Sequence, residues 1–342
     1  MADSATAATA ATAATAAGAA PAAQADWSPD EAVAGLERAT LRLPDDYEGP
    51  VVVTVVRRRP ASGPARRAAL YVHGYIDYFF QAHLAAAFAE RGWAFYAIDL
   101  RKYGRSLRPW QHPNFAKDLA EYDADLTAAI DLVAREERDP FLLLVGHSTG
   151  GLIAALYAAT GARRDRIGAL VLNSPFLDFP VNALERAALA VVGALGSPFP
   201  YLRVPNALTP AYGQSLHREH HGEWEYDQRW KPVTPFPLYA GWLRAILAAQ
   251  RRLRGGPGVC APVLLMHSDA SVRRRRWDES MMTADGMLDV ADMRRLGPTL
   301  GPRVTLAEFA GGMHDLLLSR RDVRERVVER LFAWVEPLAA GG

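Results

Sequence analysis

A serine inside the pentapeptide Gly146-His147-Ser148-Thr149-Gly150 is the strongest candidate for chemistry in this chain. The apolar run at residues 141–145 precedes the pentapeptide, and a segment rich in Ala and Leu follows it. The first pattern predicts a buried parallel strand and the second predicts a helix. A strand, a G-x-S-x-G turn and a helix in this order are typical of a nucleophile elbow, a strained turn that exposes the serine oxygen. We therefore interpret Ser148 as a nucleophile.

A serine hydroxyl is a weak nucleophile at neutral pH, so it needs a base that a third group holds in place. His314 is our candidate for the base, because it follows two glycines in a loop just after a predicted strand at residues 304–309. The neighbouring His147 is expected to pack inside the turn. The chain order of serine, acid and histidine suits a hydrolase scaffold.

The acid that would orient His314 has three candidates, all of which follow a predicted strand at residues 262–267. Asp285 is favoured, because two apolar residues and a helix-like segment come shortly after it. Asp289 and Asp269 are the alternatives. Any of these carboxylates could instead cap a helix or lie in a solvated loop.

Two backbone N–H groups are expected to stabilise the negative charge on the reacting oxygen. One is the N–H of Thr149, the residue after the nucleophile. The other is expected in the loop that follows His73 and Gly74, and by position we assign it to Tyr75. These assignments depend on position alone, because every residue except proline has a backbone N–H and the residue type does not identify the donor.

The elements that must position these groups alternate between strands and helices. Two β-branched segments, residues 39–44 and 50–59, predict an antiparallel pair. Further strands are predicted at residues 69–72, 93–100, 141–145, 169–172, 262–267 and 304–309, and helices at residues 78–91, 118–135 and 322–334. This alternation predicts a parallel sheet with helices on both faces, and chemistry collects at the carboxyl ends of the strands in such sheets.

The alternation of strands and helices is interrupted after residue 176 by a stretch that contains several Pro and Trp residues. We interpret this stretch as a mostly helical cap. We expect this cap at residues 177–257, with helices near 183–195 and 238–252, between two parts of one core at residues 27–176 and 258–338. Residues 1–26, nearly all Ala and Thr at their start, are expected to form a disordered tail.

Composition excludes several functional classes. The chain has 342 residues, half of them hydrophobic, and a net charge of +1, so no nucleic-acid surface is expected. No apolar run is long enough for a transmembrane helix. The single cysteine, Cys260, excludes an intramolecular disulfide and a cysteine-based metal site, and it fits a reducing, cytoplasmic location. His217, His220 and His221 lack the spacing of H-E-x-x-H, so we expect a polar loop and no metal there.

Taken together, five segments resemble the α/β-hydrolase superfamily. They are LYVHGY at 70–75, AIDLRKYGRS at 97–106, VGHSTGG at 145–151, PVLLMHSD at 262–269 and GGMHD at 311–315. The nearest resemblance is to the branch of monoacylglycerol lipases, lysophospholipases and serine aminopeptidases of the S33 type. It implies the α/β-hydrolase fold with an eight-stranded, mostly parallel sheet, a cap between the sixth and seventh strands, no cofactor, and ester hydrolysis through an acyl-enzyme. The chain departs from the family pattern after the seventh strand, where Ser268 and Ser271 occur and extra residues precede Asp285.

We therefore expect a serine carboxylic ester hydrolase that uses Ser148, His314 and Asp285. The apolar cap favours a lipid-like ester, such as a monoacylglycerol or a lysophospholipid. Two alternatives are a hydrolase-like scaffold that binds an apolar ligand or a partner without turnover, and an S33-type aminopeptidase. The aminopeptidase would need an acidic pocket, for which Glu219, Glu223 and Glu225 are candidates.

Overall fold

The computed structural model describes residues 25–61, 63–205 and 208–341. Residues 1–24, which make up most of the predicted tail, lie outside the described residues. Trp27 packs edge-on against Tyr96, with their ring centroids 6.2 Å apart, and the Arg57 guanidinium lies 3.8 Å from the centre of its ring. The described chain is therefore tied to the core close to its start.

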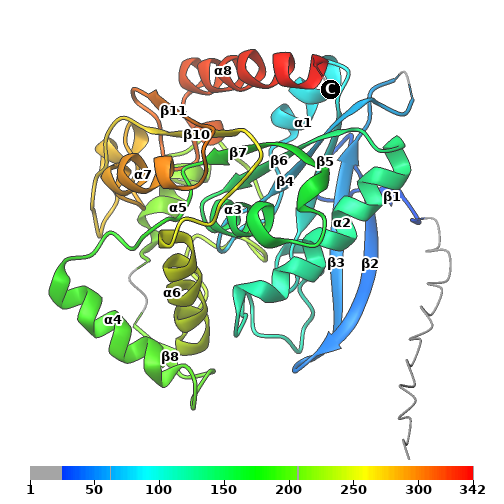
Figure 1. Ribbon diagram of the computed structural model, residues 1–342. Helices are drawn as coiled ribbons and strands as arrows, with labels where there is room; N and C mark the ends of the chain where they lie inside the picture. The colour runs from blue at the N-terminus through cyan, green and yellow to red at the C-terminus, as the bar shows by residue number, and fades with distance from the viewer. Residues whose placement is uncertain (1–24, 62, 206–207, 342) are drawn as a thin grey trace, which may run out of the picture.

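A central sheet of nine strands among the described residues organises the fold (Figure 1). Its strands are β1 (Ser28–Pro29), β2 (Glu37–Asp46), β3 (Gly49–Arg58), β4 (Arg67–Val72), β5 (Ala94–Asp99), β6 (Phe141–His147), β7 (Ile167–Asn173), β10 (Val263–Ser268) and β11 (Val304–Phe309). Their spatial order is β1-β2-β3-β5-β4-β6-β7-β10-β11. From β5 to β11 in this order, neighbouring strands pair in parallel, whereas β1 with β2, β2 with β3 and β3 with β5 form antiparallel pairs. The predicted α/β fold with a mostly parallel sheet is confirmed, and the two-residue β1 adds an edge strand to the expected eight.

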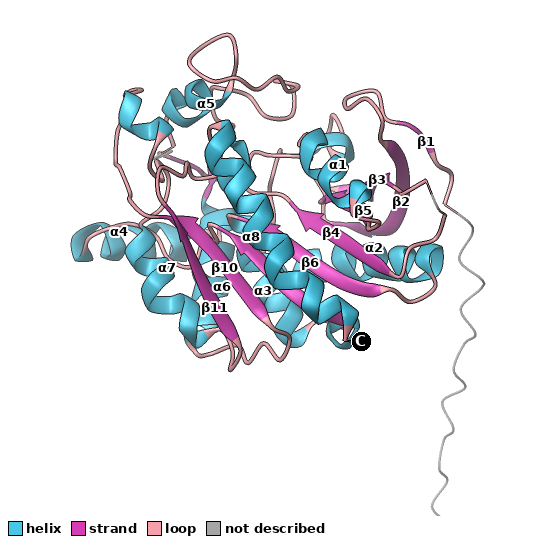
Figure 2. Cartoon of the chain, turned by 90° about the horizontal axis from the view of Figure 1, so that it is seen from above, coloured by secondary structure: helices cyan, strands magenta, loops and turns pink. Residues whose placement is uncertain are grey.

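Helices cover both faces of this sheet, as the sequence predicts (Figure 2). One face packs against α1 (Ala82–Glu90) and α8 (Arg321–Ala340), and the other packs against α2 (Tyr122–Glu137) and α3 (Thr149–Thr160). Successive residues of a strand point to opposite faces, so Tyr71 joins the first layer and Val72 joins the second. Because both faces are covered, the central strands are apolar throughout and do not alternate with polar residues.

A long segment between β7 and β10, hereafter the inserted segment (residues 174–262), carries most of the remaining helices. It contains α4 (Ala183–Leu195), β8 (Arg203–Val204), α5 (Pro210–Leu216), β9 (Leu238–Tyr239) and α6 (Ala240–Arg254). The predicted helix at residues 183–195 agrees with α4, and the one at 238–252 corresponds to α6. The small sheet formed by β8 and β9 was not predicted, because each strand has only two residues.

The remaining elements are short. They are α7 (Val290–Leu296) and the 3₁₀-helices η1 (Gly104–Ser106), η2 (Leu119–Glu121), η3 (Arg164–Arg166), η4 (Glu279–Met282), η5 (Gly297–Thr299) and η6 (Leu316–Leu318). At the carboxyl edge of the sheet, Val72 pairs with Gly146, and Asn173 pairs with both His147 and Met266. This register brings the loops that follow β4, β6 and β7 to one rim, where the predicted chemistry lies.

Candidate active site

Ser148 occupies the sharp turn between β6 and α3, with φ +52° and ψ −118°. A positive φ is strained for a residue with a Cβ, and such strain is typical of functional turns. Neighbouring glycines make the turn feasible. A Cβ on Gly150 would lie 2.2 Å from the backbone oxygen of His73, and one on Gly146 would lie 2.7 Å from the backbone oxygen of Gly150. Glycine is therefore required on both sides of the serine.

The predicted nucleophile, base and favoured acid form one hydrogen-bonded chain in the structure. His314, in the loop after β11, has its Nε2 3.0 Å from Ser148 Oγ and its Nδ1 2.9 Å from Asp285 Oδ2. An ionised carboxylate only accepts hydrogen bonds, so Nδ1 carries the proton and donates it to Asp285. Nε2 then has a free lone pair, which accepts the hydrogen bond of the serine hydroxyl. This arrangement is the one that general-base activation of a serine requires.

Asp285 reaches His314 because the extra residues after β10 fold back on themselves. The N–H of Val272 donates to the carbonyl of Asp285, and the N–H of Asp285 donates to the carbonyl of Ala270, each at 2.8 Å. Residues 272–284 therefore leave the sheet edge and return to it. The other Asp285 oxygen accepts the N–H groups of Met287 and Leu288, both at 2.8 Å, which fixes the carboxylate.

The two alternative acids lie elsewhere and have other partners. Asp289 is exposed and caps α7, with its Oδ1 accepting the N–H of Ala291 at 2.9 Å. Asp269 accepts the N–H of Gly311 at 3.1 Å. Neither aspartate has a hydrogen bond to His314 among the described residues.

The predicted oxyanion donors belong to two segments that touch each other. A Cβ on Gly74 would lie only 3.2 Å from the Cβ of Ser148, so the loop after β4 passes directly over the nucleophile. Tyr75 follows at once, and within the described chain its N–H donates to no other residue. Thr149 is the first residue of α3, where helical N–H groups have no acceptor in the preceding turn. Both N–H groups therefore lie on segments beside the nucleophile, and their role as oxyanion donors stays a prediction.

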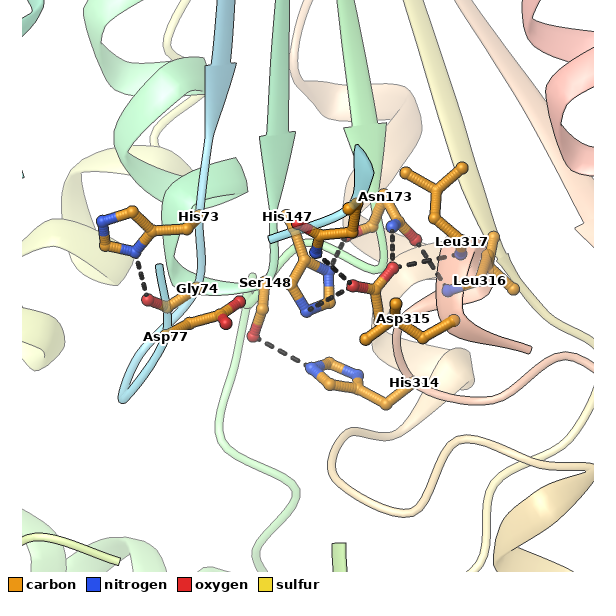
Figure 3. Close-up of polar contacts among 12 residues, drawn as sticks. His73, Gly74, Asp77, His147, Ser148, Asn173, His314, Asp315, Leu316 and Leu317 are labelled. Carbon is orange, nitrogen blue, oxygen red and sulfur yellow. Dashed lines mark hydrogen bonds and ion pairs between the residues drawn. The ribbon is translucent and has the colours of Figure 1, made fainter. Parts of the chain in front are cut away.

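A second layer of polar residues lies behind His314 (Figure 3). The sequence interpretation places His147 inside the turn, but it misses Asp315 and its contact with Asn173. Asp315 is buried, and its Oδ1 accepts the Nδ2–H of Asn173 at 2.7 Å. His147 is also buried and uses Nδ1 to donate to the backbone oxygen of Asn173 at 3.1 Å. Burial lowers the pKa of His147, which favours the neutral form of the ring. The sequence places Asp315 next to His314 and Asn173 at the end of a predicted strand, but it does not indicate that the two side chains pair.

A buried ion pair adjoins the same rim. Lys231 of the inserted segment reaches Asp77, in the loop after β4, with 2.6 Å between Nζ and Oδ1. Burial of Asp77 favours its neutral acid, but the charge of the Lys231 ammonium outweighs this effect and lowers the pKa of Asp77. The pair links the inserted segment to the loop that carries Tyr75. Sequence alone does not show it, since the two residues are far apart in the chain.

With this geometry established, comparison with known proteins assigns the chain to a family. The family described as serine aminopeptidase, S33, matches residues 63–320, most of the chain. The chain belongs to this family. Among curated proteins, a monoacylglycerol lipase of Mycolicibacterium smegmatis is 26% identical over 216 residues, which cover 60% of this chain and 70% of that protein. The prediction of a serine hydrolase of the α/β-hydrolase superfamily is confirmed.

Solved structures agree on the fold of this S33-family member. A monoacylglycerol lipase from Paleococcus ferrophilus superposes with a TM-score of 0.62 at 21% identity, covering 90% of this chain and 99% of that chain. A soluble variant of the monoglyceride lipase from Saccharomyces cerevisiae gives a TM-score of 0.61 at 16% identity, with 88% and 96% coverage. At these identities the likeness shows the fold alone.

Two further features are absent from residues 25–61, 63–205 and 208–341. None of the helices there combines the length and the apolar character that crossing a membrane requires. Those same residues contain no cluster of three or more His, Cys, Asp or Glu side chains able to hold a metal ion.

Proposed function

We propose that this S33-family member is a serine carboxylic ester hydrolase that acts through Ser148, His314 and Asp285. The observation that carries the proposal is the continuous hydrogen-bonded chain from Asp285 Oδ2 through both ring nitrogens of His314 to Ser148 Oγ, with links of 2.9 and 3.0 Å. Such a chain is the minimal arrangement for activating a serine hydroxyl.

The reaction proceeds in two halves. Ser148 Oγ attacks the ester carbonyl carbon while its proton passes to His314 Nε2, and the N–H groups of Tyr75 and Thr149 stabilise the oxyanion. The carbon–oxygen bond to the alcohol then breaks, and the alcohol leaves with the proton from Nε2. Water then attacks the carbonyl carbon of the acyl-enzyme and gives its proton to His314 Nε2. The bond to Ser148 Oγ breaks, the carboxylic acid leaves, and Ser148 takes the proton back from Nε2. Asp285 stays ionised throughout and stabilises the imidazolium.

We propose that the substrate has an apolar acyl chain, such as a monoacylglycerol or a lysophospholipid. Similarity to a protein named monoacylglycerol lipase supports this class. The surroundings support it too, since the ring of Tyr75 packs on Trp242 of α6 with 4.0 Å between their centroids. The side chains of Leu184 and Val191 on α4 are 81% and 65% exposed, and exposed apolar patches are typical of contact sites for membranes, ligands or other proteins.

The two alternatives have less support. An aminopeptidase needs a free carboxylate for the substrate amine, but Glu225 pairs with Arg218 at 2.7 Å and Glu223 pairs with Arg324. Glu219 accepts a hydrogen bond from Gln228. Glu223 also lines a groove of about 380 Å³ whose lining does not include Ser148. A scaffold without turnover would have no need for the aligned chain from Asp285 to Ser148.

The activity can be tested with a panel of p-nitrophenyl esters of increasing acyl length and a fluorophosphonate probe. The wild type should hydrolyse medium and long esters and take up the probe, whereas Ser148→Ala should lose both, with kcat lower by about 10⁴-fold or more. An unchanged rate in Ser148→Ala would contradict the mechanism. Amino-acid p-nitroanilides provide the comparison for the aminopeptidase, and their preferential cleavage would favour that alternative.

The domain organisation belongs to the same proposal. We infer that residues 177–257 act as a cap over the rim of a core formed by residues 27–176 and 258–338. The position of the ion pair between Lys231 and Asp77 supports this role, because it joins the inserted segment to the rim. A cytoplasmic location stays a prediction.

A further inference from the structure

Asn173, the last residue of β7, contacts both of the chain segments that carry the nucleophile and the base. Its backbone oxygen accepts the N–H of Ser148 at 3.0 Å and the Nδ1–H of His147 at 3.1 Å. The nucleophile turn is thereby held to the end of β7. Asn173 itself is fully buried, so water cannot replace these contacts.

The side chain of Asn173 holds the base loop. Its Nδ2 donates to Asp315 Oδ1 at 2.7 Å, and its Oδ1 accepts the N–H of Leu316 at 3.3 Å (Figure 3). This pairing needs one donor and one acceptor on the same short side chain, and asparagine supplies both. Aspartate would present acceptors only, and alanine would present neither.

Asp315 extends the connection to its surroundings. Its Oδ1 also accepts the N–H of Leu317 at 3.0 Å, and its Oδ2 accepts Nε2–H of Gln81 at 3.3 Å. Its own N–H donates to the hydroxyl of Tyr212 at 3.2 Å. His314 directly precedes this anchored residue, so its backbone cannot shift unless Asp315 also moves.

We propose that Asn173 is a positioning residue that sets the separation between Ser148 Oγ and His314 Nε2. The inference rests on the proposed function, since it assumes that these two atoms exchange the proton. Asn173 touches neither reacting atom, and it acts through the Ser148 N–H on one side and through Asp315 on the other. A loss of position of about 1 Å between reacting groups can cost about 10²-fold in rate, which sets the expected size of the effect.

The first test replaces Asn173 by Ala in the full-length protein and measures kcat and KM on a p-nitrophenyl ester. We expect kcat to fall by about 10²-fold with KM nearly unchanged, because the substrate contacts remain and only the proton transfer is misaligned. Asn114→Ala is the matched control, because Asn114 is also buried but contacts the loop at Lys102. Circular dichroism and the denaturation midpoint check the folding of each variant.

The second test uses Asn173→Asp, which keeps the size of the side chain and therefore guards against misfolding of the alanine variant. Two carboxylates would then face each other, and one must hold a proton for the pair to form. We expect kcat of this variant to fall with rising pH over a range where the wild-type rate is constant. The titratable side chains around Asp315 are His147, His83, Tyr212 and Tyr71, and all four are present in both proteins. Adding Asp315→Asn restores a donor and an acceptor and should recover part of the lost rate.

The outcomes separate this inference from the proposed function. A wild-type kcat in Asn173→Ala, together with an inactive Ser148→Ala, would overturn the inference alone. So would a pH profile of Asn173→Asp that matches the wild type. Retained activity in Ser148→Ala would overturn the proposed function and this inference together. The expected loss in kcat, its pH dependence and its partial rescue would support the positioning role.

Discussion

The carboxylate of Asp285 lies 2.9 Å from Nδ1 of His314, although the segment before Asp285 departs from the family pattern. The extra residues of this segment, 272–284, form a loop that leaves the edge of the sheet and returns beside Ala270. The parallel bridge between Ser271 and Asp285 closes this excursion at its base. An insertion of this kind changes the surface while it leaves the partner of the histidine in place.

Replacement of Asp285 by Asn should lower kcat by about 10⁴-fold, because the amide can no longer hold His314 in the tautomer that accepts the serine proton. Folding should be retained, since the amide oxygen can still accept the N–H groups of Met287 and Leu288. Steady-state kinetics on a p-nitrophenyl ester check this expectation.

The matched controls are Asp289→Asn and Asp269→Asn, which make the same chemical change at the two alternative positions. Asparagine is an equally good N-cap at position 289, so the free energy of unfolding should stay close to the wild-type value there. In both controls kcat should change by no more than about twofold, because neither aspartate bonds to His314. A large loss of kcat in either control, with near wild-type activity in Asp285→Asn, would reassign the acid.

The ion pair between Lys231 and Asp77 should contribute to stability mainly through the cost of breaking it. Lys231→Met leaves a buried carboxylate without its partner, and we expect a loss of about 3–5 kcal/mol in the free energy of unfolding at pH 7. The second change, Asp77→Asn, should recover most of this loss, because it removes the uncompensated charge. Urea denaturation measures both variants, and a stability of Lys231→Met within about 1 kcal/mol of the wild type would contradict the expectation.

The stability of the protein should decrease as the pH falls below about 6.5, the ordinary pKa of histidine. Burial lowers the pKa of His73 and of His147 in the folded state. His73 Nε2 also accepts the N–H of Leu100 at 3.1 Å, a bond that a protonated ring cannot form. The unfolded chain therefore binds protons that the folded chain excludes.

The contribution of these two neutral rings to the free energy of unfolding is fully present above pH 6.5. It is lost as the pH falls toward the pKa values of the rings in the folded state. Each ring should add a slope of up to about 1.4 kcal/mol per pH unit. Urea denaturation at intervals from pH 7.5 to 5 measures the slope, and His147→Asn should reduce it by the share of one ring. A stability that stays constant over this range would count against neutral buried histidines.

The exposed apolar side chains of α4 should matter for dispersed lipid substrates and not for soluble ones. α4 packs on α6 through Gly193, where a Cβ would lie 2.8 Å from the side chain of Leu247. Leu184 and Val191 contribute to the exposed apolar surface of α4. Replacing both by Glu should lower kcat/KM on a long-chain monoacylglycerol dispersion by about tenfold, equivalent to about 1.4 kcal/mol.

A short, soluble p-nitrophenyl ester should be hydrolysed by this double variant at the wild-type rate. Arg330→Glu on the exposed side of α8 changes the net charge by the same amount and provides the control. Equal losses on both substrates, or an equal loss in the control, would exclude a specific role of the α4 surface.

Local patterns were enough to predict much of this protein. The apolar run before Gly146 and the Ala-rich segment after Gly150 predict a strand, a turn and a helix, and β6 and α3 occur there. Continuous apolar strands predict a sheet that is covered on both faces, since only such a sheet buries every side chain. The predicted helix at residues 183–195 agrees with α4 because its helical signals are local.

Contacts between distant segments could not be predicted in the same way. The pairing of Asn173 with Asp315 spans 142 residues, and that of Lys231 with Asp77 spans 154 residues. Neither pairing leaves a periodic or compositional signal. Each depends on how the strands line up and on how the inserted segment packs over their ends.

The sequence by itself determined the fold class, the nucleophile turn and a short set of candidates for base and acid, because apolar periodicity and glycine positions act over a few residues. Only the tertiary structure decided which aspartate meets His314 and which asparagine joins the two loops. The physical reason is that a hydrogen bond requires its atoms to come within about 3 Å. The folded path of the whole chain sets that distance between residues far apart in sequence.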